Sequence, residues 1–266
     1  MAANILVTGG TGTLGGHVVP LLREAGRSVR VLSRHSREAG ADGVEYVTGD
    51  LVEDEGVEAA VDGVEIVLHL AGGPKGDDEA TRNLVRAAAS AGVRHLVYIS
   101  VIGADRLPLG YFKAKLGAER AVSDSGIPWT TLRAAQFHDL ALKVARTMAK
   151  LPVLPAPGGL RWEPVDSREV AARLVELTLG EPAGLVPDLA GPAVYGLDEL
   201  VRGYLRACGK HRLTLPVRMP GKVGRAYRDG ENLSLDGTAV GTRTWEDFLA
   251  ERLRGQEAGS LEEAVA

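Results

Sequence analysis

Residues 4–16, which read NILVTGGTGTLGG, decide the fold of this chain. The first five of these residues form a short apolar run that ends at Gly9, as a buried parallel strand does at the edge of a sheet. After the glycines, Val18 and Leu22 fall on one face of a predicted helix that closes at Gly26. A glycine-rich turn between a strand and a helix is typical of a loop that binds phosphate groups.

Three glycines of this loop have distinct expected roles. Gly9 permits a tight turn, Gly12 lets the backbone approach a pyrophosphate, and Gly15 permits close packing of the helix against the strand. The start of the helix then presents free N–H groups and the positive end of its dipole to the anion. We therefore expect a dinucleotide to bind at Gly9, Thr11, Gly12, Thr13, Leu14 and Gly15.

Strands and helices alternate regularly through the first 150 residues. Further apolar runs typical of strands lie at 28–32, 44–47, 66–70, 96–100 and 129–132, and helical patterns lie between them at 55–61, 77–91 and 111–123. Parallel strands need crossovers of this kind. The alternation predicts an α/β fold, a Rossmann doubly wound parallel sheet.

The composition changes after about Lys150. Prolines and glycines between residues 152 and 159 predict a loop, and the elements expected beyond it are irregular: strands at 161–165 and 185–189, helices at 167–179, 197–207 and 245–254. We expect an NADP(H)-binding Rossmann domain at 1–150 and a small α+β C-terminal substrate lobe at 151–255 that can return a strand to the main sheet. Residues 256–266 are expected to form a flexible tail.

The bulk composition narrows the class of protein. With 266 residues, 45% hydrophobic and 25% charged, the chain has the make-up of an ordinary globular protein. A net charge of −4 with scattered basic residues predicts no nucleic-acid partner, and the single cysteine, Cys208, predicts neither a disulfide nor a metal site. Because no signal peptide and no apolar run of about 20 residues are visible, we expect a cytoplasmic monomer or homodimer with no membrane partner.

The end of the second predicted strand distinguishes between two dinucleotides. An NAD site usually places an acidic residue there to hold the ribose hydroxyls, whereas this chain reads SRHSR at residues 33–37. Arg34 can stack on adenine and pair with a 2′-phosphate. We therefore expect NADP(H). Asp50, after the third strand, is expected either to accept from the adenine amino group or to act as a turn residue.

Together these residues resemble the short-chain dehydrogenase/reductase superfamily, most closely its atypical, NmrA-like branch of NAD(P)H-binding proteins. The segments that carry the resemblance stand in family order: VTGGTGTLGG (7–16), GDL (49–51), HLAGG (69–73), YFKAKLGAE (111–119) and PVDSREVA (164–171). The resemblance covers residues 4–179 well. It implies a Rossmann domain with a small substrate lobe, and cofactor contacts from Leu70, Ala71 and Gly72 beside the fourth strand. Leu51, next to Asp50, is also expected to contact the cofactor. Where the superfamily commonly has Asn-Ala-Gly, this chain has Leu70-Ala71-Gly72, so a proton relay through an asparagine is not expected.

Tyr111 and Lys115 are four residues apart on a predicted helix and therefore share one face. In the family that the chain resembles, the lysine binds the nicotinamide ribose and lowers the pKa of the tyrosine, which donates a proton to a carbonyl. Lowering a phenol pKa from ~10 to ~7 needs about 4 kcal/mol of preferential stabilisation of the phenolate, much of which a nearby ammonium can supply. Ser100, at the carboxyl end of the fifth strand, is expected to donate a hydrogen bond to the substrate oxygen.

The segment after the sixth strand also lies at the carboxyl edge of the sheet, where the resemblance places substrate contacts. Gln136 and His138 are expected to line the substrate pocket and Phe137 to form an apolar wall, with His138 as an alternative acid. The other interpretation of this segment is a helix start. His69, inside an apolar strand, is expected to be a core histidine with satisfied hydrogen bonds.

These residues predict an NADPH-dependent reductase that transfers hydride to a carbonyl, enone or quinone of a small apolar molecule. One alternative is a redox sensor that binds NADP(H) without catalysis, which the missing asparagine favours and the Tyr111/Lys115 pair opposes. The other is an epimerase or lyase that uses the bound cofactor transiently.

Overall fold

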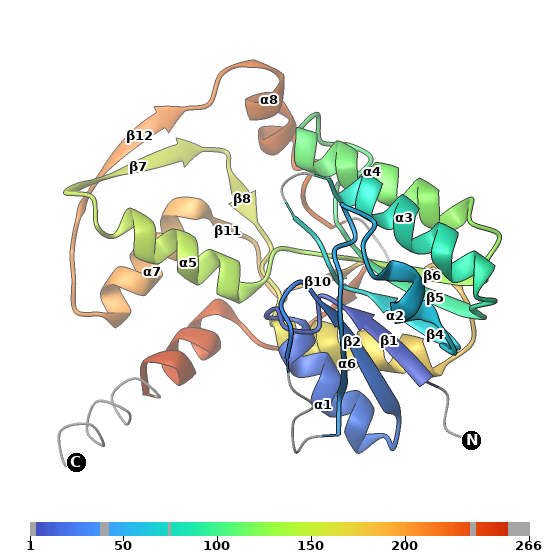
Figure 1. The fold of residues 1–266 in the computed structure, drawn as a ribbon. Helices are drawn as coiled ribbons and strands as arrows, with labels where there is room; N and C mark the ends of the chain where they lie inside the picture. The colour runs from blue at the N-terminus through green and yellow to red at the C-terminus, as the bar shows by residue number, and fades with distance from the viewer. Residues whose placement is uncertain (1–3, 38–42, 74–75, 235–237, 255–266) are drawn as a thin grey trace, which may run out of the picture. The chain divides into compact units, whose positions relative to one another are not determined.

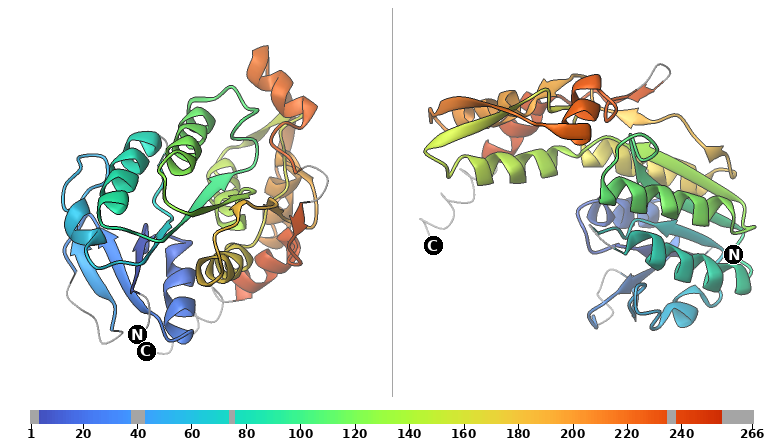
Figure 2. Two further views of the ribbon diagram at one scale, coloured as in Figure 1. Left: turned by 90° about the vertical axis from the view of Figure 1, so that its right-hand side faces the viewer. Right: turned by 90° about the horizontal axis from the view of Figure 1, so that it is seen from above.

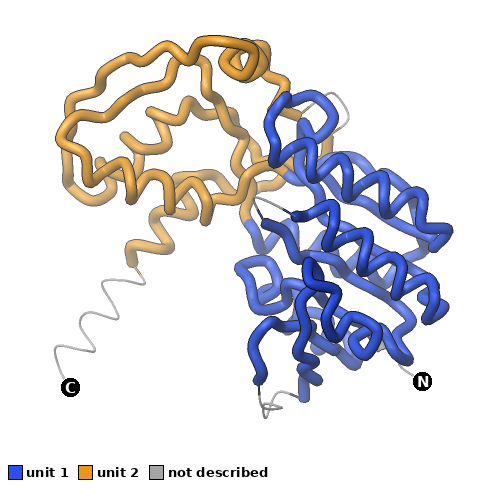
Figure 3. The backbone as a smooth tube through the Cα atoms, turned by 45° about the horizontal axis from the view of Figure 1, so that its top comes forward, with its two compact units in different colours: residues 1–134, 167–188 blue, residues 135–166, 189–266 orange. Residues whose placement is uncertain are grey.

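The computed structural model describes residues 4–37, 43–73, 76–234 and 238–254. The chain forms two compact units, residues 1–134 with 167–188 and residues 135–166 with 189–266 (Figure 3). The boundary expected from the sequence lies at residue 150, whereas the chain passes between the two units three times. Residues 167–188 return to the first unit because α6 (Ser167–Leu179) packs against α1 (Gly15–Glu24) there. The predicted tail at 256–266 lies outside the described residues.

The first unit is built on a parallel sheet (Figure 1). Its strands lie side by side in the order β3, β2, β1, β4, β5, β6 and β9, and each neighbouring pair is parallel. The strand bounds are β1 Asn4–Thr8, β2 Ser28–Ser33, β3 Glu45–Thr48, β4 Ile66–His69, β5 His95–Val101, β6 Trp129–Ala134 and β9 Gly184–Leu185. The predicted Rossmann sheet is confirmed, and β9 is a strand that the C-terminal part returns to it.

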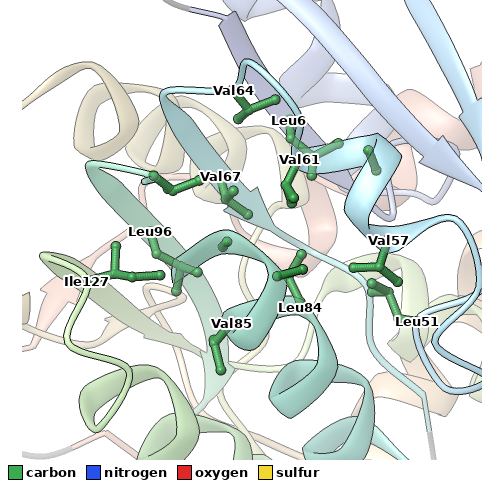
Figure 4. Close-up of a cluster of buried hydrophobic side chains, with 14 of the residues drawn as sticks. Leu6, Leu51, Val57, Val61, Val64, Val67, Leu84, Val85, Leu96 and Ile127 are labelled. Carbon is green, nitrogen blue, oxygen red and sulfur yellow. The ribbon is translucent and has the colours of Figure 1, made fainter. Parts of the chain in front are cut away.

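Helices cover both faces of this sheet. On one face, α2 (Val57–Val61), α3 (Asp77–Ser90) and α4 (Gly110–Ser123) follow one another, and the turned views show α3 and α4 side by side (Figure 2). The apolar core beneath them includes Leu6, Val67 and Leu96 from three strands and Leu84 from α3 (Figure 4). Because Leu84 is fully buried, its truncation to alanine should cost about 2–5 kcal/mol of stability. This core fixes the strand ends that form the site.

The second unit combines helices with short ladders. Its helices are α5 (His138–Met148), α7 (Leu197–Ala207), α8 (Gly221–Asp229) and residues 245–254. The ladders pair β7 (Val153–Gly158) with β12 (Leu213–Arg218), β8 (Arg161–Trp162) with β11 (Tyr195–Gly196), and β10 (Leu189–Ala190) with β13 (Ala239–Val240). Trp245 is fully buried and its indole N–H donates to the Leu200 carbonyl at 3.2 Å. This mixture agrees with the predicted small α+β lobe.

Three local predictions in the second half are wrong. Residues 152–159, expected as a loop, contain the strand β7, which pairs with β12 in a two-stranded sheet. Both strands of such a sheet are edge strands, and an edge strand can contain proline. The strand expected at 185–189 is divided between β9 and β10. The strand expected at 161–165 ends at Trp162.

Among the described residues, no helix has both the length and the apolar character needed to cross a bilayer.

Candidate cofactor pocket and active site

A pocket of about 540 Å³ opens at the carboxyl ends of the strands of the first unit. Its walls come from the loop after β1, the end of β2, the turn after β3, the segment after β4 and the start of α3. This is the edge at which open α/β folds bind their ligands. The predicted cofactor contacts that line it are Gly9, Thr11, Gly12, Arg34, Asp50, Leu51, Leu70, Ala71 and Gly72.

The glycine loop packs so tightly that a side chain cannot be added at two of its positions. A Cβ on Gly9, which has φ +69°, would lie 2.6 Å from the Ala71 nitrogen, and one on Gly15 would lie 2.4 Å from the Gly10 Cα. Within α1 itself, no side chain caps the N-terminus and no acidic residue occupies the first turn. The positive end of the helix dipole is therefore available to an anion. Thr13, Leu14 and Gly15 build this helix start and do not line the pocket themselves.

Arg34 lies at the pocket as an exposed cation. It makes no ion pair with any residue that the structure describes. The neighbouring polar groups are already engaged: the Ser33 hydroxyl donates to the His35 carbonyl at 2.9 Å, and the Arg37 guanidinium lies 5.9 Å from the centre of the Tyr46 ring. Arg34 is therefore the basic side chain of this loop that can meet an anionic ligand.

Asp50 serves the turn after β3. Its Oδ1 accepts from the Val52 backbone N–H at 2.8 Å, which confirms the predicted turn role. Asp50 also lines the pocket, and its contact with adenine stays a prediction.

Lys115 is buried and fully occupied by groups of the protein. Its ammonium lies 2.8 Å from Asp77 Oδ2, and the exposed fractions of the two side chains are 6% and 4%. It also donates to the Tyr98 hydroxyl at 3.2 Å and to the Ile99 carbonyl at 3.4 Å. A Cβ at Gly72, on the pocket wall, would lie 3.0 Å from the ammonium. Lys115 therefore lies next to the pocket with its charge paired.

Asp77 and Tyr98 do not appear among the residues that the sequence analysis selected. Asp77 is one of three consecutive acidic residues in the first turn of α3, a pattern that also suits the helix dipole. Tyr98 is one residue of a strand whose seven residues are all buried. The sequence alone gives no signal that either side chain meets Lys115.

Tyr111 lies one helical turn before Lys115 but is not hydrogen-bonded to it among the described residues. Although 39% of Tyr111 is exposed, burial of its hydroxyl region and then the Asp77 carboxylate raise its pKa to about 12. The predicted lowering of this pKa is therefore wrong. The physical reason is that burial disfavours the charged phenolate, and the negative charge of Asp77 disfavours it further.

Ser100 has a buried hydroxyl, and the residue does not line the pocket. The residue is 5% exposed, and its Oγ has no hydrogen-bond partner among the described residues. On β5 it lies two residues after Tyr98, on the same face of the strand. A buried polar atom without a partner is costly, so this arrangement favours the predicted donation to a substrate oxygen, which stays a prediction.

His69, on β4, is hydrogen-bonded on both sides to segments that flank the pocket. The Ala71 backbone N–H donates to Thr8 Oγ1, which leaves the Thr8 hydroxyl to donate to His69 Nδ1 at 2.7 Å. On the other side, Thr81 Oγ1 donates to the Asp77 carbonyl and lies 3.0 Å from His69 Nε2, which must then carry the proton. Burial lowers the pKa of His69 to about 3. The prediction of a core histidine is confirmed.

The three predicted substrate contacts belong to the second unit. Phe137 precedes α5 and His138 is its first residue, so the interpretation as a helix start is confirmed. His138 is fully buried, with ring centres 5.9 Å from Trp245 and 5.2 Å from Phe248. The Gln136 Oε1 atom is buried without a hydrogen-bond partner in the described part of the chain. Contact of Gln136, Phe137 and His138 with a substrate stays a prediction.

Comparison with known proteins gives sequence and structural matches. A family model described as NAD(P)H-binding matches residues 9–177. The (4-alkanoyl-5-oxo-2,5-dihydrofuran-3-yl)methyl phosphate reductase of Streptomyces griseus is 35% identical over 212 residues, which cover 77% of this chain and 74% of that protein. The NAD(P)H azoreductase of Xenophilus azovorans is 32% identical over 222 residues, which cover 80% and 75%.

Among solved structures, the NADPH-dependent quinone oxidoreductase of Escherichia coli, determined in complex with NADPH, has a TM-score of 0.78. The match covers 94% of this chain and 99% of that one at 23% sequence identity. At this identity the likeness shows a common fold.

Proposed function

Because this chain belongs to the NAD(P)H-binding family of atypical, NmrA-like short-chain dehydrogenases/reductases, we propose that it reduces the carbonyl, enone or quinone group of a small apolar molecule with NADPH. It binds NAD(P)H and is an NAD(P)-dependent oxidoreductase. The preference for NADPH and the class of substrate are the proposed parts. The names of the relatives span a furanone phosphate, azo compounds and a quinone, which supports reduction as the common chemistry.

The observation that carries this proposal is the pocket itself, with an uncapped helix start on one side and, on the other, Arg34, which no described residue pairs. The glycine loop has no room for side chains at Gly9 and Gly15, as expected where a diphosphate meets the backbone. No carboxylate is present in the run at residues 33–37 to hold a ribose 2′-hydroxyl, whereas a guanidinium suits a 2′-phosphate. The residues present therefore fit NADPH.

The glycine loop, Lys115, Ser100 and Tyr111 have different roles in the proposed reaction. The bound nicotinamide supplies a hydride. The loop at residues 9–12 would hold the diphosphate, and Lys115 would exchange its 3.4 Å contact with the Ile99 carbonyl for a hydrogen bond to the adjoining ribose. Ser100 orients the substrate oxygen. Tyr111, whose raised pKa keeps it protonated at neutral pH, donates a proton to that oxygen.

The test is consumption of NADPH, followed by its absorbance, with a panel of quinones, enones and ketones. We expect turnover with at least one class, and we expect Tyr111→Phe to lower kcat by about 10²-fold or more with little change in NADPH affinity. Tyr46→Phe is the matched control, because the ring that Arg37 covers is kept and only a hydroxyl is lost. This control should retain the kcat of the wild type.

Other outcomes would contradict the proposal in different ways. If no substrate consumes NADPH and the protein binds NADP⁺ and NADPH with different affinities, the chain is a redox sensor. If a substrate is converted without net consumption of NADPH, the chain is an epimerase or lyase. If Tyr111→Phe turns over like the wild type, Tyr111 is not the proton donor.

A further inference from the structure

The Lys115 ammonium and the Asp77 carboxylate form a buried ion pair beside the cofactor pocket. Their 2.8 Å separation and exposures of 6% and 4% leave little water to screen them. Two opposite charges so close together have a weak net field at a third group. A lone ammonium would stabilise a phenolate at Tyr111, whereas the paired ammonium does so much less.

The position of Asp77 is built into the fold before any ligand binds. Its Oδ1 accepts from the Gly73 backbone N–H at 3.0 Å, and its own carbonyl accepts from Thr81 Oγ1 at 2.6 Å. The next residue, Asp78, differs: its side chain is 36% exposed and pairs with Arg82 one turn later. The first turn of α3 thus directs one of two adjacent aspartates to Lys115.

None of the other titratable groups described around Lys115 and Tyr111 offsets the Lys115 charge as Asp77 does. His69 on β4 stays neutral, because burial lowers its pKa to about 3. Tyr98 on β5 stays protonated, because burial raises its pKa strongly. Glu119, on α4 itself, is held by Arg133 at 2.7 Å. Asp77 is the carboxylate that contacts the ammonium among the described residues.

We propose that Asp77 is a positioning residue of the active site: it fixes the Lys115 ammonium and offsets its charge, so that Tyr111 stays protonated and poised for reduction. This inference rests on the proposed reductase function. In the reductive direction, the carbonyl carbon gains a hydride while its oxygen takes the hydroxyl proton of Tyr111, and solvent then returns a proton to the phenolate. The opposite direction needs Tyr111 as a phenolate that removes a proton from an alcohol, and the paired Lys115 keeps that form scarce.

The direct test is titration of Tyr111 in the full chain without cofactor. Tyrosine labelled with carbon-13 at Cζ reports ionisation by NMR, and the Tyr111 signal is the one lost in Tyr111→Phe. We expect the wild-type signal to show no ionisation below about pH 11. In Asp77→Asn the midpoint should fall by about one unit or more, which is about tenfold more phenolate at a given pH.

The matched control is Asp78→Asn, which removes a negative charge from the same helical turn without contacting Lys115. It should leave the Tyr111 midpoint where it is in the wild type. Equal midpoints in the wild type and Asp77→Asn, or equal shifts in the two aspartate variants, would overturn the proposal.

A second pair of variants covers the case in which Asp77→Asn does not fold. Lys115→Met leaves Asp77 without its cation, and the double variant Asp77→Asn/Lys115→Met removes both charges. The Tyr111 midpoint should be lower in the double variant than in Lys115→Met, because a carboxylate has been removed. Equal midpoints in these two proteins would overturn the proposal as well.

An activity profile completes the test and separates the two proposals. In the active enzyme, the alkaline limb of kcat for reduction should move to lower pH in Asp77→Asn and not in Asp78→Asn. The NMR titration needs neither cofactor nor substrate, so absence of NADPH consumption would defeat the proposed function alone. If the protein consumes NADPH but Asp77→Asn leaves the Tyr111 titration unchanged, only the proposed role of Asp77 is contradicted.

Discussion

Among the described residues, two cations beside the pocket of the first unit, Arg34 and Lys115, have opposite surroundings. Arg34 is exposed and makes no ion pair with a described residue, whereas Lys115 is buried and holds Asp77, Tyr98 and the Ile99 carbonyl. An exposed guanidinium can accept a ligand phosphate at little cost in desolvation. A buried ammonium is tolerated only because its partner is present. The charge of Arg34 is therefore available to a ligand, and that of Lys115 is part of the fold.

The largest expected effect comes from breaking the buried pair. Lys115→Met leaves the Asp77 carboxylate buried without its cation, which should lower the free energy of unfolding by about 3–5 kcal/mol. Urea unfolding measures this loss. Asp77→Asn/Lys115→Met should recover most of it, because a pair replaced by neutral groups leaves no buried charge. A loss below about 1 kcal/mol in Lys115→Met would mean that the pair does not behave as a buried one.

The next effect concerns the open cation. Arg34→Glu removes a charge-assisted contact to the 2′-phosphate and introduces repulsion, so NADPH affinity should fall by about 2–3 kcal/mol, roughly 30- to 150-fold. NADH lacks that phosphate, and its affinity should change by less than about threefold by the same argument. Calorimetric titration of both nucleotides gives the two numbers.

The matched control for this prediction is Arg37→Glu. Arg37 lies over the Tyr46 ring rather than in the pocket lining, so this substitution should weaken NADPH binding much less than Arg34→Glu. Equal losses for the two nucleotides in Arg34→Glu would remove the phosphate role of Arg34.

The smallest effect is the change in stability per pH unit that arises from His69, the neutral histidine near the Lys115–Asp77 pair. The pKa of His69 is lowered to about 3 by burial and then by Lys115. Between pH 6.5 and about 3 the unfolded chain therefore binds a proton at His69 that the folded chain does not. Stability should fall as pH falls through this window, by up to about 1.4 kcal/mol per pH unit, and no loss from His69 is expected above it.

Urea unfolding of the wild type and His69→Gln at several pH values measures this slope. His95 is also buried with a lowered pKa and contributes a slope of its own, so the informative quantity is the difference between the two proteins. An identical slope in His69→Gln would mean that His69 does not stay neutral in the fold.

The fold of the first unit could be predicted because its signals are local. Apolar runs such as residues 4–8 and 96–100, followed by glycines or helical patterns, specify a parallel sheet and the edge where its strands end. The position of the pocket follows from that edge. In the second unit, β7 contains Pro155 and Pro157 and is a strand because β12, some 60 residues later in the chain, lies beside it. No local pattern contains that information.

The candidate site could be predicted only in part for the same reason. The helical spacing of Tyr111 and Lys115 places them on one face of α4 but does not say which groups meet that face. Asp77 comes from a helix that begins 38 residues earlier in the chain. It is one of three acidic residues in a row, and which of them turns inward depends on the packing of α3 against α4. The contribution of Asp77 to the raised pKa of Tyr111, which adds to the effect of burial, depends on that choice and cannot be read from the sequence.

The measurement that tests the account most directly is calorimetric titration of the purified chain with NADPH and with NADH under identical conditions. We expect one NADPH per chain, bound at least about tenfold more tightly than NADH, a difference of about 1.4 kcal/mol. No binding of either nucleotide at millimolar concentration, or equal affinity for both, would contradict it.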